Sequence, residues 1–283
     1  MTRQLVVNAD DLGLTEGVNR AAVAAHLEGI VTSVSLLAVG RAFDHAVRLL
    51  HDHPALSVGA HLAVVGEDPP LLTAAEVPTL VDRQGRFPLS YRTVVLRAAT
   101  GRLDPGDVRR ELAAQLERIR AAGLPVAHLD THQHTHLWPS VGRVVGDLAD
   151  AADVRWVRVP TSRSARPVGV VVRRLSLGLA HQLAERGLRH PDAYAGLDEA
   201  GRLDGMRFAR ALSALAADLG SGGVAEVNTH PGEADDPDLD RFTWRYQWEE
   251  ERQMLTDPTS FEQVRYHGFA LTSFAALTDG EPR

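Results

Sequence analysis

Apolar and polar positions follow two alternating patterns along the chain. Short apolar runs at residues 4–9 and 30–39 predict strands, whereas residues 16–28 carry apolar positions at helical spacing. Thr15 is a typical N-cap for this first helix, and Gly29 is a typical C-terminal stop. The chain is therefore expected to begin as strand, helix, strand.

The same alternation continues toward the C-terminus. Further strands are expected at residues 56–65, 126–129, 155–159 and 224–227, and helices at 43–51, 107–122, 141–151 and 205–219. Serial strand–helix alternation is typical of a parallel sheet covered by helices. For a chain of 283 residues, the pattern predicts an α/β fold in the form of an irregular (β/α) barrel.

Two stretches interrupt this rhythm. Residues 67–103 contain several Pro and Gly turn signals, and residues 161–204 mix a helical segment with turns. We expect both to be loop insertions that shape a substrate mouth, because barrels bind ligands with the loops that follow their strands. No internal repeat or linker divides the sequence, so residues 1–283 are expected to form a single domain.

Charge and composition narrow the range of partners. A formal net charge of −7 leaves no basic field with which to hold nucleic acid. No uninterrupted apolar stretch approaches the roughly 18 residues of a membrane span, and the first residues lack a secretory signal pattern. We therefore expect a cytoplasmic protein with a small or neutral substrate. The oligomeric state stays open, with a homodimer among the alternatives.

The chain has no cysteine and 13 histidines. Disulfides, thiolate catalysis and thiolate zinc sites are thereby excluded, and any metal must be held by His, Asp or Glu side chains. Candidate metal or catalytic sites are therefore sought among the histidines and the acidic residues near strand ends.

Asp10 and Asp11 end the first predicted strand, and Gly13 marks the turn that follows. Neighbouring side chains in a regular strand point to opposite faces, so the two aspartates can share a site only where the strand gives way to the turn. An Asx-type turn would explain the pair equally well. His61 lies in an apolar strand, where a hydrogen-bonded core histidine is the more common case.

The segment 128–136 places His128, Asp130, His132, His134 and His136 at every second position after an apolar strand. In an extended chain these five side chains share one face. A solvated strand edge would explain one or two of them, but the full run favours metal binding or acid–base chemistry.

His230 precedes Pro231 and Gly232 at the end of another predicted strand. Alone it would be an ordinary turn histidine. However, four separate strand ends each deliver a His or an Asp, and the carboxyl ends of parallel barrel strands lie on one face, where such enzymes keep their sites.

These motifs resemble the YdjC-like carbohydrate deacetylase family, which includes chitooligosaccharide deacetylases and hopanoid-associated deacetylases. The matching pieces are residues 8–13, 59–62, 128–134 and 229–232. The resemblance implies a NodB-like deacetylase barrel that holds one divalent metal ion. It also implies the site residues, which are Asp11, His61 and His132 as metal ligands, Asp10 as general base and His230 as general acid.

Two further residues are expected to support this site. Asp130 would orient a ligand histidine, the usual arrangement around a metal-bound imidazole, and His134 would do the same or contact the substrate. A set of two histidines and one carboxylate favours zinc, with magnesium as the alternative.

The expected function is metal-dependent hydrolysis of the N-acetyl group of an N-acetylated amino sugar. An N-acetylglucosaminyl oligosaccharide, a glycolipid and an antibiotic intermediate all fit. The alternatives are a metal-dependent phosphoesterase or amidohydrolase on a barrel, which usually opens with His-x-His on its first strand, and a non-catalytic sugar-binding relative, which would need neither Asp10 nor His230. A two-carboxylate glycosidase is disfavoured because Asp10 and Asp11 are adjacent.

Overall fold

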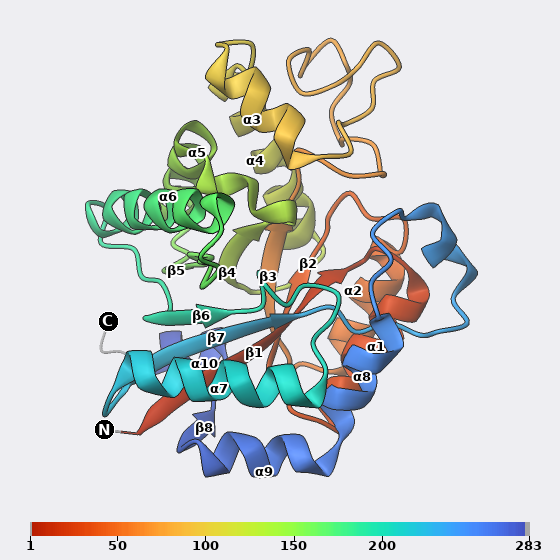
Figure 1. Cartoon of the computed structure of the whole chain (residues 1–283). Coiled ribbons are helices and arrows are strands. Elements are labelled where there is room, and N and C mark those ends of the chain that lie inside the picture. Colours follow the sequence, from red (N-terminus) through yellow and green to blue (C-terminus); the bar gives the residue numbers. More distant parts are fainter. Residues whose placement is uncertain (1, 281–283) are drawn as a thin grey trace.

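Parallel strands form the centre of the molecule (Figure 1). The computed structural model describes residues 2–280, and within them eight strands join one sheet in the order β5-β4-β3-β2-β1-β7-β6, with β8 also paired to β1. The strands are β1 (Arg3–Leu12), β2 (Ser33–Leu36), β3 (Ser57–Leu62), β4 (Val126–Thr131), β5 (Trp156–Val157), β6 (Ala193–Ala195), β7 (Gly223–Thr229) and β8 (Phe269–Leu271).

Helices fill most of the connections between these strands. They are α1 (Glu16–Leu27), α2 (Phe43–Asp52), α3 (Tyr91–Ala99), α4 (Pro105–Ala121), η1 (His132–Leu137), α5 (Pro139–Ala151), α6 (Pro167–Ala184), α7 (Gly205–Leu219), η2 (Pro237–Arg241), α8 (Trp248–Thr256), α9 (Pro258–Tyr266) and α10 (Phe274–Asp279). None of the helices within residues 2–280 combines the length and apolar character needed to cross a membrane.

Local sequence signals explain where the helices begin. The Thr15 hydroxyl accepts a hydrogen bond from the Val18 amide at 3.0 Å, which confirms the expected N-cap of α1. Asp104 caps α4, and Pro105 occupies its first turn, where a missing amide proton costs nothing. Helix α7 has the bounds that the sequence predicts.

The sheet curls toward closure between its two edges. An isolated parallel bridge joins Trp156 of β5 to Arg189, a few residues before β6. The strands at the two edges of the sheet are short: β5 has two residues and β6 has three, so the ring of strands is uneven. These features confirm the predicted irregular (β/α) barrel.

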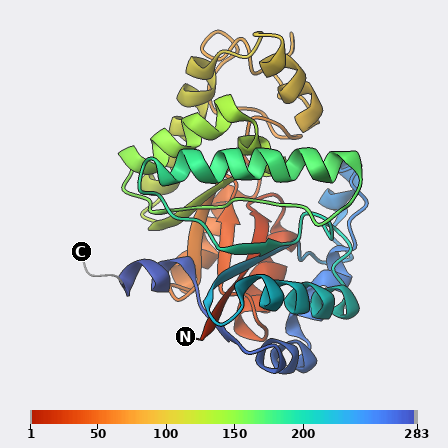
Figure 2. The same ribbon diagram turned by 60° about the vertical axis from the view of Figure 1, so that its left-hand side comes forward.

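The two expected insertions lie at different places in this fold. Residues 67–103 carry α3 and project beyond the sheet (Figure 1). Residues 161–204 carry α6, which lies between the sheet and the α3 segment in Figure 2. The second stretch also supplies β6, a strand that the sequence analysis did not predict because three residues in a turn-rich segment carry no alternation to recognise.

Candidate metal and catalytic site

The end of β1 brings two neighbouring aspartates into one site. The pairing of β1 with β2 shifts register between Ala9 and Leu12, and Asp11 adopts a left-handed backbone with φ 64°. Aspartate tolerates this conformation better than most residues. Because the regular alternation of the strand is broken here, Asp10 and Asp11 both reach the cleft described below.

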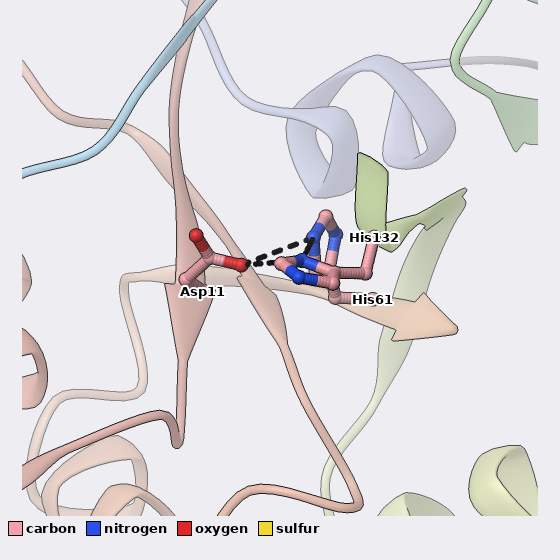
Figure 3. A group of neighbouring side chains, drawn as sticks. All are labelled: Asp11, His61 and His132. Atoms are coloured by element: carbon pink, nitrogen blue, oxygen red, sulfur yellow. Dashed lines mark hydrogen bonds and ion pairs between the residues drawn. The ribbon is translucent and has the colours of Figure 1, made fainter. Parts of the chain in front are cut away.

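Asp11, His61 and His132 converge at the carboxyl ends of β1, β3 and β4 (Figure 3). The Asp11 Oδ1 atom lies 2.9 Å from His132 Nδ1 and 3.3 Å from His61 Nε2. The two imidazole nitrogens are 3.4 Å apart. All three side chains are buried, so their polar atoms must be satisfied within the site.

The chemistry of this donor set fits a divalent metal ion. One oxygen and two nitrogens lie within 4.8 Å of one another. The Asp11 Oδ1 atom is buried and faces both imidazole nitrogens, and no other donor of the described residues reaches it. Three protein ligands leave coordination positions open, as catalytic rather than structural metal sites do.

Asp130 holds the ring of His61 from behind. Its Oδ1 atom lies 2.7 Å from His61 Nδ1, which leaves Nε2 facing Asp11. Burial alone would lower the pKa of His61, but the carboxylates of Asp130, Asp11 and Asp10 raise it to about 10. The same negative field favours a divalent cation beside this ring.

A buried arginine joins the acidic residues into one network. Arg158 donates to Asp10 Oδ1 and Oδ2 and to Glu226 Oε1, each at 2.7 Å, and its Nη1 atom forms an ion pair with Asp130 Oδ2 at 2.7 Å. The Arg158 side chain is fully inaccessible to solvent, so this charge depends on its three carboxylate partners. The planar guanidinium fixes the orientation of the Asp10 carboxylate through two parallel bonds.

Asp10 is ionised and held in place, but it is not one of the three candidate metal ligands, which are Asp11, His61 and His132. Burial by itself would raise the pKa of Asp10, yet the Arg158 guanidinium lowers it below its ordinary value. Asn8 Nδ2 donates to Asp10 Oδ1 at 2.7 Å, and Asn228 Nδ2 donates to Oδ2 at 3.2 Å. Asp10 therefore presents a fixed carboxylate to the cleft.

His230 enters the cleft from the loop after β7. Its backbone amide donates to Glu251 Oε2 at 2.7 Å, and its Nδ1 atom lies 3.9 Å from the same oxygen. Burial raises the pKa of Glu251, although the neighbouring His230 opposes this shift. Helix α8 thus supplies an acidic partner directly behind the histidine.

The histidine run does not share one face, so that expectation is wrong. Strand β4 ends at Thr131, and the backbone then turns through left-handed conformations at Gln133 (φ 51°) and His134 (φ 52°). Only His132 of the run reaches the Asp11 carboxylate. His134 instead lies 3.4 Å from the Tyr194 hydroxyl.

His128 and His136 are structural residues of the core. The His128 ring stacks on Phe274 with centroids 4.1 Å apart, and burial lowers its pKa to about 4. His136 lies 2.6 Å from Thr131 Oγ1 and 2.9 Å from the Arg158 carbonyl oxygen, and burial lowers its pKa to about 4 as well. Both rings are therefore neutral at physiological pH.

A cleft of about 500 Å³ opens over these groups, and we call it the polar cleft. Its lining combines the acidic residues, the histidines and the aromatic rings of three further residues: Asp10, Asp11, His61, Leu89, Ser90, Tyr91, Arg92, His132, Gln133, His134, Leu197, Ala200, His230, Thr243, Trp244 and Tyr246. The Trp244 ring lies 5.2 Å from the His132 ring, and the Tyr246 ring lies 5.0 Å from the His230 ring.

Sequence reasoning missed several residues of this site. Arg158 lies in a predicted strand, where a single charged residue is ordinarily a solvent-facing position. Glu226 carried a similar signal, since it interrupts an apolar strand. The roles of Glu251 and Trp244 had no local signal, because their contact with the site depends on how residues 242–254 pack against the barrel.

The sequence and the fold both have known relatives. A carbohydrate deacetylase of Geobacillus stearothermophilus is 36% identical over 276 residues, which cover 97% of this chain and 98% of the relative. A human carbohydrate deacetylase is 32% identical over 303 residues, covering 99% and 92% of the two chains.

A solved structure from Enterococcus faecalis, of a protein provisionally assigned to cellobiose-phosphate cleavage, shares the fold. Its TM-score is 0.80 at 24% identity, and the match covers 98% of this chain and 99% of that one. The sequence profile of the YdjC-like proteins matches residues 4–265. The chain therefore belongs to the YdjC-like family.

Proposed function

We propose that this protein is a metal-dependent N-deacetylase that removes the acetyl group of an N-acetylated amino sugar. The observation that carries the proposal is the convergence of Asp11, His61 and His132 in one cleft with Asp10 and His230. A metal-binding protein without turnover would not need the last two residues. The relatives named carbohydrate deacetylases support the same reaction class.

The three converging donors would hold the ion through one carboxylate oxygen and two imidazole nitrogens. Zinc suits this set better than magnesium, which prefers oxygen ligands. Once bound, such an ion polarises an amide carbonyl and makes water a stronger nucleophile near neutral pH.

Asp10 acts as the general base in this proposal. Arg158 keeps its carboxylate ionised and oriented, so one oxygen can accept the proton that the attacking water loses. The Arg158 guanidinium, rather than solvent, stabilises the negative charge of this buried carboxylate.

His230 acts as the general acid toward the leaving amine. The Glu251 carboxylate lies on the Nδ1 side of the ring, which leaves the Nε2 side for the substrate. Proton delivery there converts the amine into a good leaving group when the C–N bond breaks.

Trp244 and Tyr246 provide the binding surface for the sugar ring. Their rings are 5.6 Å apart and stand beside His132 and His230, so an apolar sugar face packed on them would bring its acetamide toward both histidines.

Acetate release from a panel of N-acetylated sugars tests the proposal. The panel contains N,N′-diacetylchitobiose and N-acetylglucosaminyl glycosides, and metal-stripped protein is reloaded with zinc or magnesium. We expect acetate only after reloading, and an Asp10→Asn variant should lose about 10²- to 10⁴-fold in rate while it keeps its metal content. Metal retention without acetate release, together with hydrolysis of a simple phosphoester, would instead favour the phosphoesterase alternative.

A further inference from the structure

A second cavity adjoins the polar cleft, and we call it the apolar pocket. It has a volume of about 500 Å³, within the ~300–1,000 Å³ range of small-molecule sites. Its walls come from α3, η1 and α6, and both α3 and α6 pack against η1. Valine and leucine side chains dominate the lining, including Val94, Leu137, Val171, Val172 and Leu175.

The two cavities lie next to each other and share part of their lining. Tyr91, Gln133, His134 and Leu197 line both of them. A molecule whose polar end lies beside Asp11 and His230 can therefore extend past His134 into the apolar pocket without leaving the protein surface.

Most polar side chains around the apolar pocket already have partners within the protein. Ser162 Oγ donates to Asp198 at 2.6 Å, and the Gln133 amide group bonds to the backbone of Tyr91 and Leu89. Thr135 Oγ1 and His134 Nδ1 are exceptions, since neither atom has a hydrogen-bond partner among the described residues. The walls consequently offer dispersion and desolvation far more than hydrogen bonds, so a second sugar ring would lose its water contacts there without replacement.

The rim of the apolar pocket is unusually apolar for an exposed surface. Val168 and Val171 on α6 are 67% and 55% exposed, and Tyr91 at the start of α3 is 41% exposed. An exposed apolar patch that borders a cavity is typical of a binding site.

We propose that the substrate carries an apolar aglycone, such as an alkyl chain, which binds in the apolar pocket while the N-acetylated sugar occupies the polar cleft. This inference rests on the proposed function, and it makes the preferred substrate amphiphilic rather than a free oligosaccharide. The contact belongs to ground-state binding as well as to the transition state, so it should lower KM more than it raises kcat.

Kinetics with matched glycosides test this proposal. Octyl, methyl and triethylene glycol N-acetylglucosaminides are compared below the micelle concentration. Each fully buried methylene is worth roughly a fourfold gain, so we expect kcat/KM for the octyl compound to exceed the methyl value by at least about tenfold, with the triethylene glycol compound close to methyl.

Two variants on one helix make the test specific. Val171 lines the apolar pocket, whereas Val170 is 44% exposed on the same helix and does not line it. Val171→Asp should remove the octyl preference and leave the methyl glycoside unchanged, and Val170→Asp should behave as wild type. Equal kcat/KM for octyl and methyl compounds in the wild type would overturn the proposal while the deacetylase activity stands.

Calorimetric titration with the octyl glycoside separates the two proposals if no acetate is released. If the octyl glycoside binds, and if Val171→Asp weakens this binding while Val170→Asp does not, the proposal of an apolar aglycone site is retained and the proposal of a deacetylase is rejected. If the octyl compound binds no more tightly than the methyl compound, the apolar aglycone site is rejected.

Discussion

Asp130 is a fully buried carboxylate that contacts both the candidate ligand set and the charge network. One oxygen faces His61 Nδ1 at 2.7 Å, and the other accepts a hydrogen bond from Ser35 and forms an ion pair with Arg158, both at 2.7 Å. Asp130 thus lies where a carboxylate commonly fixes the tautomer and direction of a metal-bound imidazole.

Replacing Asp130 by Asn should weaken metal binding without abolishing it. The Asp130 carboxylate carries a full negative charge and stabilises a His61 ring that donates from Nδ1. The neutral amide of Asn lacks this charge, so we expect the zinc dissociation constant to rise about 10- to 100-fold. Competitive titration with a chromogenic chelator measures this change. Unaltered zinc affinity and activity would show that Asp130 serves the fold alone.

At the scale of single residues, the sequence identified the converging groups better than their surroundings. Residue patterns alone left Asp11 and His61 with ordinary structural explanations, and the family resemblance singled them out with His132. Arg158 could not be recognised, because its significance comes from three carboxylates on β1, β4 and β7. Contacts between distant strands have no signature in local spacing.

At the scale of elements, the turn after β4 has the largest effect on the site. The expected extended run through residue 136 fails because Gln133 and His134 adopt left-handed conformations, which are uncommon for residues other than glycine. The turn is held by Gln133, whose side chain accepts from the Tyr91 amide at 2.8 Å and donates to the Leu89 carbonyl at 3.0 Å.

We expect a Gln133→Ala variant to loosen the α3 segment locally. Both bonds lie near the surface, so their loss should change the free energy of global unfolding by no more than about 1–2 kcal/mol. Amide hydrogen exchange should accelerate in residues 89–99 and stay unchanged in β1 and β3. Uniform exchange rates in wild type and variant would contradict this role for Gln133.

The regular elements were easier to predict than the irregular ones. Helix α7 and the N-cap of α1 follow from strong local signals, whereas the expected strand at 155–159 shrinks to Trp156–Val157. Short edge strands depend on their neighbours for stability more than on their own composition.

At the scale of the whole molecule, three buried carboxylates share the single guanidinium of Arg158. Glu226 is the partner that this sharing satisfies least, since burial raises its pKa to about 7 against the stabilising effect of Arg158. Its Oε2 atom is buried and has no hydrogen-bond partner among the described residues. Folding therefore favours the protonated form of Glu226 over the ionised form.

This predicts a pH-dependent difference between the wild type and a Glu226→Gln variant. A folded-state pKa raised from 4.5 to about 7 contributes stability that is fully present below pH 4.5 and is lost as pH rises through about 7. The variant, which cannot ionise, lacks this loss. Urea unfolding at about pH 5 and about pH 8 should show the variant gaining a few kcal/mol on the wild type at the higher pH. A difference that does not change with pH would reject the assignment.

The packing of distant segments is the part of the fold least accessible from sequence. The turn signals in residues 67–103 and 161–204 indicated that both stretches depart from the barrel pattern, and they placed both near a substrate mouth. The packing of α3 and of α6 against η1, which creates the apolar pocket, depends on tertiary contacts that periodicity does not encode.

The central claim is that the reaction depends on an ion held by Asp11, His61 and His132. The most direct measurement is a zinc titration of metal-stripped protein, with bound zinc and acetate release from N,N′-diacetylchitobiose and the octyl glycoside recorded on the same samples. His132→Ala serves as the test variant, and His181→Ala, whose side chain is 77% exposed, serves as the matched control.

We predict that activity rises with bound zinc to a plateau at one ion per chain in the wild type and in the control. His132→Ala should lose more than about 100-fold in zinc affinity, which is a larger loss than the one expected for Asp130→Asn. It should lose acetate release as well. Full acetate release from the metal-free protein, or unchanged zinc binding in His132→Ala, would contradict the account.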